Sequence, residues 1–184
     1  MIDLENVFLA WQEFRVGKTK REDVQLFERY LEDNIFQLVK ELSTGAYRHG
    51  HYHTFPIRDP KPRIISKATV RDRLVHHLVF RELYRLFEPT FIFHSYSSRL
   101  DKGTHLAVAN LALACCRLSH NYTRPIFALK CDVKKFFASV SHQKLLAIIQ
   151  EKIKDTQFFE LVKEIVESFN SNPNSSLEGV GGGG

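Results

Sequence analysis

The sequence predicts an α+β fold that is mostly helical. Apolar residues recur at helical spacing over most of the 184 residues, as expected for helices that bury one face. Two segments instead have strand composition: residues 52–65, which a turn divides, and the apolar run 126–131. With 43% hydrophobic residues, the chain has enough apolar side chains to build a core.

The N-terminal part is predicted to form two helices. The first spans residues 4–15, and a basic break from Val16 to Arg21 separates it from a longer helix over about 22–43. Gly45 follows as a helix terminator. The second helix has a long apolar stripe, typical of a face packed in a core: Val24, Leu26, Phe27, Tyr30, Leu31, Ile35, Leu38, Val39 and Leu42.

A β-hairpin with basic residues around its tip is predicted next. Residues 52–57 and 63–65 have strand composition, and the intervening segment 58–62 contains two prolines and an aspartate, as turns often do.

Four more helices are expected after the hairpin. The first spans residues 69–87 and is stopped by Glu88 and Pro89. A helix over 103–118 is rich in Ala and Leu, which predicts burial, and Thr104 is a candidate cap for it. The last two helices are expected over about 142–153 and 156–169, before an Asn/Ser/Gly-rich tail.

The apolar run 126–131 is followed directly by one carboxylate, Asp132, and then by a basic and aromatic turn. Its apolar composition predicts a buried strand. A carboxylate at the end of a core strand is costly to bury unless a cation or hydrogen-bond donors compensate its charge, so Asp132 is a candidate ligand of Mg²⁺ beside a phosphate substrate. The alternative is that Asp132 caps the next helix.

Composition limits the classes of protein to consider. The net charge of +5 and the pI near 9.1 favour a polyanionic partner without identifying one. Three cysteines, in apolar segments, predict reduced core thiols and no disulfide framework. There is no apolar run of membrane-spanning length and no basic signal-peptide start, so we expect no membrane partner and a cytoplasmic location. Phosphate-binding glycine loops are absent from the sequence.

Several histidines have competing interpretations. Adjacent His76 and His77 point in different directions on a helix, which disfavours a zinc site. His49, His51 and His53 alternate, so they could share a face and bind metal if a strand extended that far, although surface histidines near nucleic acid are the preferred interpretation. Asp72, in the first turn of its helix, is expected to be structural.

Three ordered blocks resemble those of bacterial reverse transcriptases. Residues 131–142, CDVKKFFASVSH, resemble motif A, which opens the palm of these enzymes. Upstream, residues 60–77, PKPRIISKATVRDRLVHH, resemble the fingers block, and 95–107, SYSSRLDKGTHLA, resemble the block that follows it. The residue pattern of these blocks is closest to that of the retron-like and diversity-generating retroelement branch. The resemblance covers roughly residues 44–170.

The resemblance implies the fingers and partial palm of a right-hand polymerase. Its expected parts are an N-terminal helical region over 1–44, fingers over 45–125, the first part of the palm over 126–170 and a flexible tail over 171–184. The implied activity is RNA-directed DNA polymerisation, a nucleotidyl transfer. The implied cofactor is Mg²⁺, with Mn²⁺ as a substitute, and the implied partners are an RNA template, a DNA or RNA primer and a dNTP.

The same resemblance assigns roles to individual residues. Asp132 and the carbonyl of Val133 match metal ligands. Phe137 matches a bulky residue beneath the sugar that clashes with a ribose 2′ hydroxyl and so favours deoxynucleotides. In the alternative interpretation, Phe136 and Phe137 only anchor the turn in the core.

The remaining predicted contacts are basic. Nucleotide binding is assigned to Lys61, Arg63 and Lys67, with Arg63 preferred for the triphosphate and Lys61 also able to contact template phosphate. The alternative is a solvated hairpin whose charges prevent edge pairing. Nucleic-acid binding is assigned to four further residues: Arg99, Lys102, Lys134 and Lys135.

The family's metals also need an aspartate pair from a later block, and this sequence contains no adjacent aspartates. We therefore expect an N-terminal fragment that is inactive alone and lacks the C-terminal palm and thumb of its parent. Two other classes compete with this interpretation. One is a noncatalytic nucleic-acid-binding module with a fingers-like basic groove, and the other is a purely structural helical domain.

Overall fold

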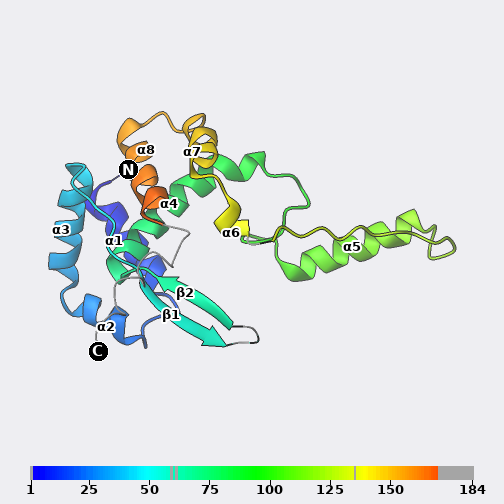
Figure 1. Ribbon diagram of the computed structural model, residues 1–184, viewed down its shortest axis with the longest axis horizontal. Helices are drawn as coiled ribbons and strands as arrows, with labels where there is room; N and C mark the ends of the chain where they lie inside the picture. Colours follow the sequence, from blue (N-terminus) through cyan, green and yellow to red (C-terminus); the bar gives the residue numbers. More distant parts are fainter. Residues whose placement is uncertain (1, 59, 61, 135, 170–184) are drawn as a thin grey trace, which may run out of the picture. The chain divides into compact units, whose positions relative to one another are not determined.

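The computed structural model describes residues 2–58, 60, 62–134 and 136–169. The described chain is α+β, mostly helical with one small antiparallel sheet, in agreement with the predicted class (Figure 1). Its elements are α1 (Leu4–Arg15), α2 (Glu22–Arg29), α3 (Leu31–Ser43), β1 (His53–Arg58), β2 (Pro62–Lys67), α4 (Val70–Phe87), η1 (Glu88–Thr90), α5 (Thr104–Leu118), α6 (Phe136–Ser139), α7 (His142–Gln150) and α8 (Thr156–Ser168).

The chain forms two compact units. Unit 1 contains the described parts of Met1–Glu82 and Phe137–Gly184, and unit 2 is Leu83–Phe136. The predicted division into an N-terminal region, fingers, palm and tail is a different partition, and it stays a prediction. The predicted tail, 171–184, lies outside the described residues.

Unit 1 has a well-formed core where α1, α3, α4 and α8 contribute their apolar faces. Trp11 is almost completely buried and contacts the rings of Phe14 and Phe27, with centroids 5.9 and 5.0 Å away. Aromatic pairs at such separations add to the stability that burial provides. The aliphatic side chains with no exposed surface in this core are Val7, Ala10, Val24, Ile35, Leu38, Leu74 and Val75.

Local sequence signals define several helix ends. The Asp3 carboxylate accepts a hydrogen bond from the Asn6 amide at 2.8 Å, and Asp155 accepts one from the Phe158 amide at 3.1 Å. Both aspartates are N-cap residues that satisfy an amide left without an intrahelical partner. The predicted bounds of α1 are confirmed, and α4, α7 and α8 agree with prediction to within a few residues.

The predicted single helix over about 22–43 is wrong. The chain breaks at Tyr30, whose φ of −120° and ψ of 39° are not helical, so that α2 and α3 are separate helices. The side-chain amide of Asn34 donates a hydrogen bond of 2.9 Å to the carbonyl of Phe27, which compensates part of the backbone hydrogen bonding lost at the break.

The predicted hairpin is confirmed. β1 and β2 pair antiparallel with His53 opposite Lys67 and Arg58 opposite Pro62. Pro56 and Pro62 have no amide hydrogen to donate, which a two-stranded sheet tolerates because each strand is an edge. Asp59 and Lys61, at the turn, lie outside the described residues.

Unit 2 has almost no core, which overturns two predictions. Among its described residues only Ser119 is buried. The predicted burial of the helix over 103–118 is wrong: Val108, Leu111 and Leu113 of α5 are all more than half exposed. A helix that is apolar on several sides needs neighbours on several sides. Among the described residues of this unit, α5 is the only α-helix apart from the ends of α4 and α6.

The predicted buried strand over 126–131 is also wrong. These residues have no regular secondary structure, and Phe127 and Leu129 are 98% and 92% exposed. A strand forms only when its main-chain groups pair with another strand. Among the described residues the only sheet is β1 with β2, so this segment has no strand to pair with.

Two smaller predictions also need correction. Thr104 is the first residue of α5 rather than its cap; Gly103, with φ of 109°, is at the N-cap position, and no side chain caps the helix. The cysteines are free thiols, as predicted, but they are not core residues, because Cys115 and Cys116 are half-buried and Cys131 is exposed. Of the helices in the described ranges, none combines the length and apolar character that a membrane crossing requires.

Candidate functional site

Asp132 is an exposed residue of unit 2. The backbone around it is irregular, and Val133 beside it is 60% exposed. α6 begins only at Phe136, so Asp132 is too far from that helix to be its N-cap residue, and the capping alternative is not supported. The carboxylate is therefore accessible to a cation or a substrate.

The residues around Asp132 provide part of a metal site. Mg²⁺ binds oxygen ligands, keeps several waters, and in nucleotide sites uses one or two carboxylates together with substrate phosphates. The Asp132 carboxylate and the Val133 carbonyl are oxygen ligands of this kind. Within the described ranges, however, no three His, Cys, Asp or Glu side chains come together as a metal-binding group. Asp132 thus suits the role of one ligand among several.

Phe136 is the last residue of unit 2 and Phe137 begins the second stretch of unit 1, and neither ring is buried. Phe137 is 81% exposed and Phe136 is 54% exposed. The alternative in which one of these rings anchors the turn in the core is therefore not supported.

The hairpin cations are in different environments. Arg63 is exposed on β2 opposite Ile57. Lys67, at the base of the same strand, forms an ion pair of 2.7 Å with Asp23 of α2, and Asp23 also pairs with Arg73 of α4. Burial raises the pKa of Asp23, but the hydrogen bond from Lys67 and the charge of Arg73 outweigh it, so the pKa of Asp23 is below its usual value.

Residues 63 and 67 are on the same face of β2, because alternate strand residues point to the same side. Lys67 links β2 to α2 through its ion pair with Asp23, whereas Arg63 lies nearer the tip of the hairpin. Lys61, the third predicted nucleotide contact, lies outside the described residues.

Arg99 organises the loop that precedes α5. Its side chain is only 9% exposed and binds both oxygens of Glu88 at 2.6 to 3.0 Å. It also donates to the carbonyls of Ile92 and Ser95, each at 3.0 Å. The hydrogen bonds from Arg99 lower the pKa of Glu88. The Arg99 guanidinium therefore already makes its hydrogen bonds within unit 2, and a nucleic-acid phosphate would have to displace some of them in order to bind it.

Lys102 contributes to the same loop. Its ammonium donates to the carbonyl of Phe93 at 3.2 Å and lies 4.0 Å from the centroid of that ring. Lys134 is exposed beside the predicted metal ligands, and Lys135 lies outside the described residues. Of the four predicted nucleic-acid contacts, Lys134 is the cation with an exposed position next to Asp132.

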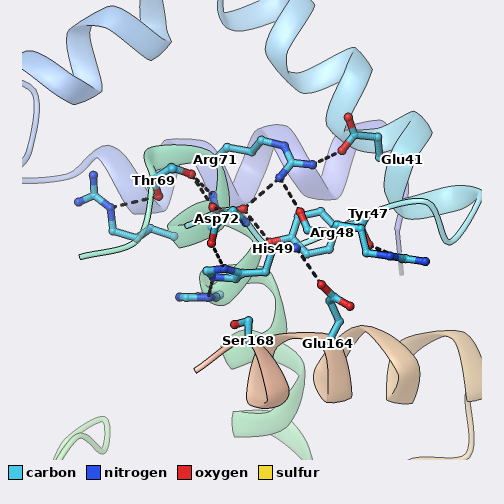
Figure 2. A network of polar contacts seen from close by, with 12 residues as sticks. Glu41, Tyr47, Arg48, His49, Thr69, Arg71, Asp72, Glu164 and Ser168 are labelled. Atoms are coloured by element: carbon cyan, nitrogen blue, oxygen red, sulfur yellow. Dashed lines mark hydrogen bonds and ion pairs between the residues drawn. The ribbon is translucent and has the colours of Figure 1, made fainter. Parts of the chain in front are cut away.

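An extensive polar network of unit 1 surrounds Asp72 (Figure 2). Asp72 has no exposed surface, and its carboxylate accepts hydrogen bonds from the hydroxyls of Tyr47 at 2.8 Å and Thr69 at 2.6 Å. It also accepts from the Gly50 amide at 3.2 Å and from Arg71 at 3.0 Å. The prediction that Asp72 is structural is confirmed, because it joins α4 to the segment before β1.

The charge of Asp72 is maintained by these donors. Burial alone raises the pKa of Asp72, but the hydrogen bonds from Thr69 and Tyr47 outweigh that effect and lower it. For Tyr47, burial and the neighbouring carboxylate both raise the pKa of the phenol. Asp72 therefore stays ionised and Tyr47 stays a donor at neutral pH.

Sequence reasoning missed most of this network, although one local signal was available. Thr69 and Asp72 form a capping pair at the start of α4, since the Asp72 amide also donates to the Thr69 hydroxyl at 3.2 Å. A Thr followed three residues later by an acid marks such a helix start. No local pattern identifies Tyr47, which meets Asp72 only through the tertiary fold.

The histidine metal alternatives are not supported. β1 begins at His53, so His49 and His51 precede the strand. The Nε2 atom of His77 lies 3.0 Å from a carboxylate oxygen of Glu13 on α1, and that of His76 lies 3.0 Å from Nε2 of His49.

Comparison with known proteins relates the chain to intron-encoded proteins at low identity. No protein-family model matches it. It is 26% identical over 106 residues to an uncharacterized 91 kDa protein in the cob intron of Schizosaccharomyces pombe, covering 58% of this chain and 12% of that protein. It is 22% identical over 147 residues to the group II intron-encoded protein LtrA of Lactococcus lactis, covering 76% of this chain and 22% of LtrA.

A third relative extends this pattern. The putative COX1/OXI3 intron 1 protein of Saccharomyces cerevisiae is 22% identical over 134 residues, which cover 72% of this chain and 15% of that protein. In each of these three proteins, the chain spans less than a quarter of the relative's length. The chain is thus a distant relative of intron-encoded proteins, including a group II intron-encoded protein.

Proposed function

We propose that this chain is part of an RNA-directed DNA polymerase, a reverse transcriptase, and contributes its fingers and the first part of its palm. The observation that carries the proposal is the motif A resemblance at residues 131–142, with an accessible carboxylate at Asp132. The two upstream blocks in the same order and the distant relation to intron-encoded proteins support it. In this assignment residues 1–44 are the N-terminal helical region, 45–125 the fingers, 126–170 the start of the palm and 171–184 a tail. The residue pattern of the motifs favours the retron-like and diversity-generating retroelement branch.

The reaction joins a primer to a deoxynucleotide. The primer 3′ hydroxyl attacks the α-phosphorus of the dNTP, a new phosphodiester bond forms, and the bond to pyrophosphate breaks as the hydroxyl proton is lost. Mg²⁺, or Mn²⁺ in its place, would neutralise the developing charge when bound. The residues of this chain that would hold it are Asp132, through its carboxylate, and Val133, through its carbonyl.

Other residues would bind and select the nucleotide. Arg63, exposed on β2, is suited to bind the triphosphate, because a guanidinium can donate two hydrogen bonds to one phosphate. Lys61 and Lys67 would assist it, although Lys67 also holds the hairpin to α2 through Asp23. The exposed ring of Phe137 would exclude a ribose by contact with its 2′ hydroxyl.

The basic residues assigned to nucleic acid divide into two kinds. Lys134 and Lys135 flank the metal ligands, where their charge would attract the template and primer backbones. Arg99 and Lys102 would act by shaping the loop before α5, because the hydrogen bonds of Arg99 are made within unit 2. Nucleic acid would then contact the loop that they order.

Further chain would be needed to complete the site. A single carboxylate cannot hold two metal ions, and the expected aspartate pair is not in this sequence. The exposed apolar segment 126–131 also suits pairing with a strand from elsewhere. We therefore propose that the chain is inactive by itself and that the rest of the palm and the thumb belong to a longer parent protein.

Asp132→Asn in the longer protein tests the assignment. Incorporation of radiolabelled dNTP on an RNA template with a DNA primer is expected to fall on the order of 10³-fold, because loss of a metal-binding charge costs several kcal/mol of transition-state stabilisation. Asp33→Asn, which changes an exposed acid of α3 outside the assigned site, is the matched control and should retain activity. An unchanged rate for Asp132→Asn would refute the site assignment.

The second candidate is a noncatalytic nucleic-acid-binding module with a basic groove. The net charge of +5 and the absence of adjacent aspartates from the sequence favour it. This module would bind primer-template with strong salt dependence. It would show no Mg²⁺-dependent dNTP binding, which equilibrium binding to the longer protein can measure.

A further inference from the structure

We propose that His49 and His76 form a pH-sensitive latch, which fastens the segment Tyr47–Tyr52 to α4 and α8 near neutral pH and releases it in acid. The inference concerns the packing of unit 1 and does not rest on the polymerase function. All of its residues belong to unit 1.

The two imidazoles share one hydrogen bond. Nε2 of His49 lies 3.0 Å from Nε2 of His76, and the ring planes are inclined by only 17°. Nδ1 of His49 lies 2.6 Å from the carbonyl oxygen of Gly50, which can only accept, so Nδ1 carries a hydrogen. In neutral His49 the Nε2 atom is then the acceptor, and the bond is donated by Nε2 of His76.

This arrangement limits how many protons the pair can hold. One extra proton can go to Nδ1 of His76 and leave the hydrogen bond intact. A second would have to go to Nε2 of His49, where two N–H groups would point at each other and break the contact. In the released state each ring can take its own proton. The latched state therefore binds at least one proton fewer in acid.

Charged and titratable groups from several elements surround the pair. Burial and the nearby charge of His49 lower the pKa of His76, whereas the Asp72 carboxylate opposes this effect and Arg73 reinforces it. The other ionisable groups of the network are contributed by the segment itself, α3, α4 and α8: Tyr47, Arg48, Tyr52, Glu41, Arg71 and Glu164. The combined effect is that His76 is harder to protonate in the latched state.

His49 is at the point where three parts of the chain meet (Figure 2). Its backbone amide donates to the Glu164 carboxylate of α8 at 2.9 Å, and the next amide, of Gly50, donates to Asp72 of α4. Tyr52 stacks on the His49 ring, and its hydroxyl lies 3.2 Å from that of Ser168. Loss of the histidine bond would loosen the segment that leads into β1.

A metal would not explain the pair as well as a hydrogen bond does. Stable zinc sites in proteins use three or four side-chain ligands. In the part of the chain that the structure describes, no third His, Cys, Asp or Glu joins the two histidines as a metal-binding group. The proton is therefore the ion to which this contact responds.

The sign and size of the pH effect follow from linkage. The latched state has the lower proton affinity, so its stability is fully present above the ordinary histidine pKa of about 6.5 and decreases as the pH falls below that value. With a difference of one proton, the equilibrium constant for release should rise about tenfold between pH 7.5 and pH 5.5.

Hydrogen exchange of the His49 and Gly50 amides in the full chain tests the latch. After correction for the intrinsic exchange rate, we expect opening of this segment to increase about tenfold from pH 7.5 to pH 5.5, relative to amides of α1. His76→Gln should abolish the increase, because a glutamine amide can donate to neutral His49 and, when flipped, accept from protonated His49. His77→Gln, whose partner is Glu13, is the matched control and should keep the wild-type response.

Two results would overturn the proposal: a wild-type change below twofold, or an undiminished pH response in His76→Gln. If that variant does not fold, the wild-type ring protons give the answer by NMR. Coupled titration with one step displaced to lower pH than that of an ordinary histidine would support the latch, whereas two independent and undisplaced steps would refute it.

Discussion

Replacing Asp72 with asparagine should strongly destabilise unit 1. The two carboxylate oxygens accept from four donors: Tyr47 and Arg71 at one oxygen, Thr69 and the Gly50 amide at the other. Asparagine has a single acceptor oxygen and presents an NH₂ group in place of the second. If that NH₂ faces Gly50, two donors oppose each other in a buried position.

The magnitude follows from the groups affected. A hydrogen bond to a charged group contributes about 1.5 to 3 kcal/mol, and a buried donor left without an acceptor costs about 1 to 3 kcal/mol. Because the remaining bonds are weakened rather than lost, we expect a decrease of about 3 kcal/mol in the free energy of unfolding. With a urea m-value of about 2 kcal/mol/M, the midpoint should shift by about 1.5 M.

Urea unfolding followed by the fluorescence of Trp11 is the appropriate assay, because this buried indole, in the core of unit 1, is the only tryptophan of the chain. Asp101→Asn, at an exposed position with φ of 54° that asparagine tolerates, is the control and should change stability by less than about 0.5 kcal/mol. A midpoint shift below 0.5 M for Asp72→Asn would mean that the donors find water instead, and would refute the argument.

Two further substitutions test the contacts of each unit. Gly50→Ala would place a methyl group 2.9 Å from a carboxylate oxygen of Asp72 that accepts a hydrogen bond from Thr69. We expect about 1 to 3 kcal/mol of destabilisation in the same urea assay. An unchanged unfolding midpoint would show that the network can shift freely. Arg99→Lys keeps the charge but cannot bind both Glu88 oxygens and two carbonyls at once, so amide exchange in residues 88–103 should accelerate with no effect on α1; equal protection in both proteins would show that the fork geometry is unimportant.

The helices and the hairpin could be predicted because their signals are local. α1 has an N-cap aspartate and an apolar stripe, and the hairpin has two strand-like segments around a proline-containing turn. The break at Tyr30 could not be predicted in this way. The apolar stripe continues through it, and the interactions around the break, such as Asn34 with Phe27 and Phe27 with Trp11, depend on the folded geometry.

The candidate site shows a similar division. Its residues were assigned through the resemblance of three sequence blocks to those of reverse transcriptases, and Asp132, Arg63 and Phe137 are exposed in the structure. The resemblance could not reveal that Lys67 and Arg99 form ion pairs with Asp23 and Glu88. A motif specifies residue types at positions, whereas the partners of a long cation are set by acids that can lie anywhere in the chain.

One added strand could both pair with residues 126–131 and complete the metal site at Asp132. Within the described residues, segment 126–131 has strand composition but no strand partner, and Asp132, which follows it, belongs to no group of three or more metal-binding side chains. A strand added next to this segment would pair its main-chain groups and cover Phe127 and Leu129. If that strand also carried acids near its turn, it would bring them to Asp132. Under the proposed function, folding of this part of unit 2 and assembly of the metal site are therefore the same event.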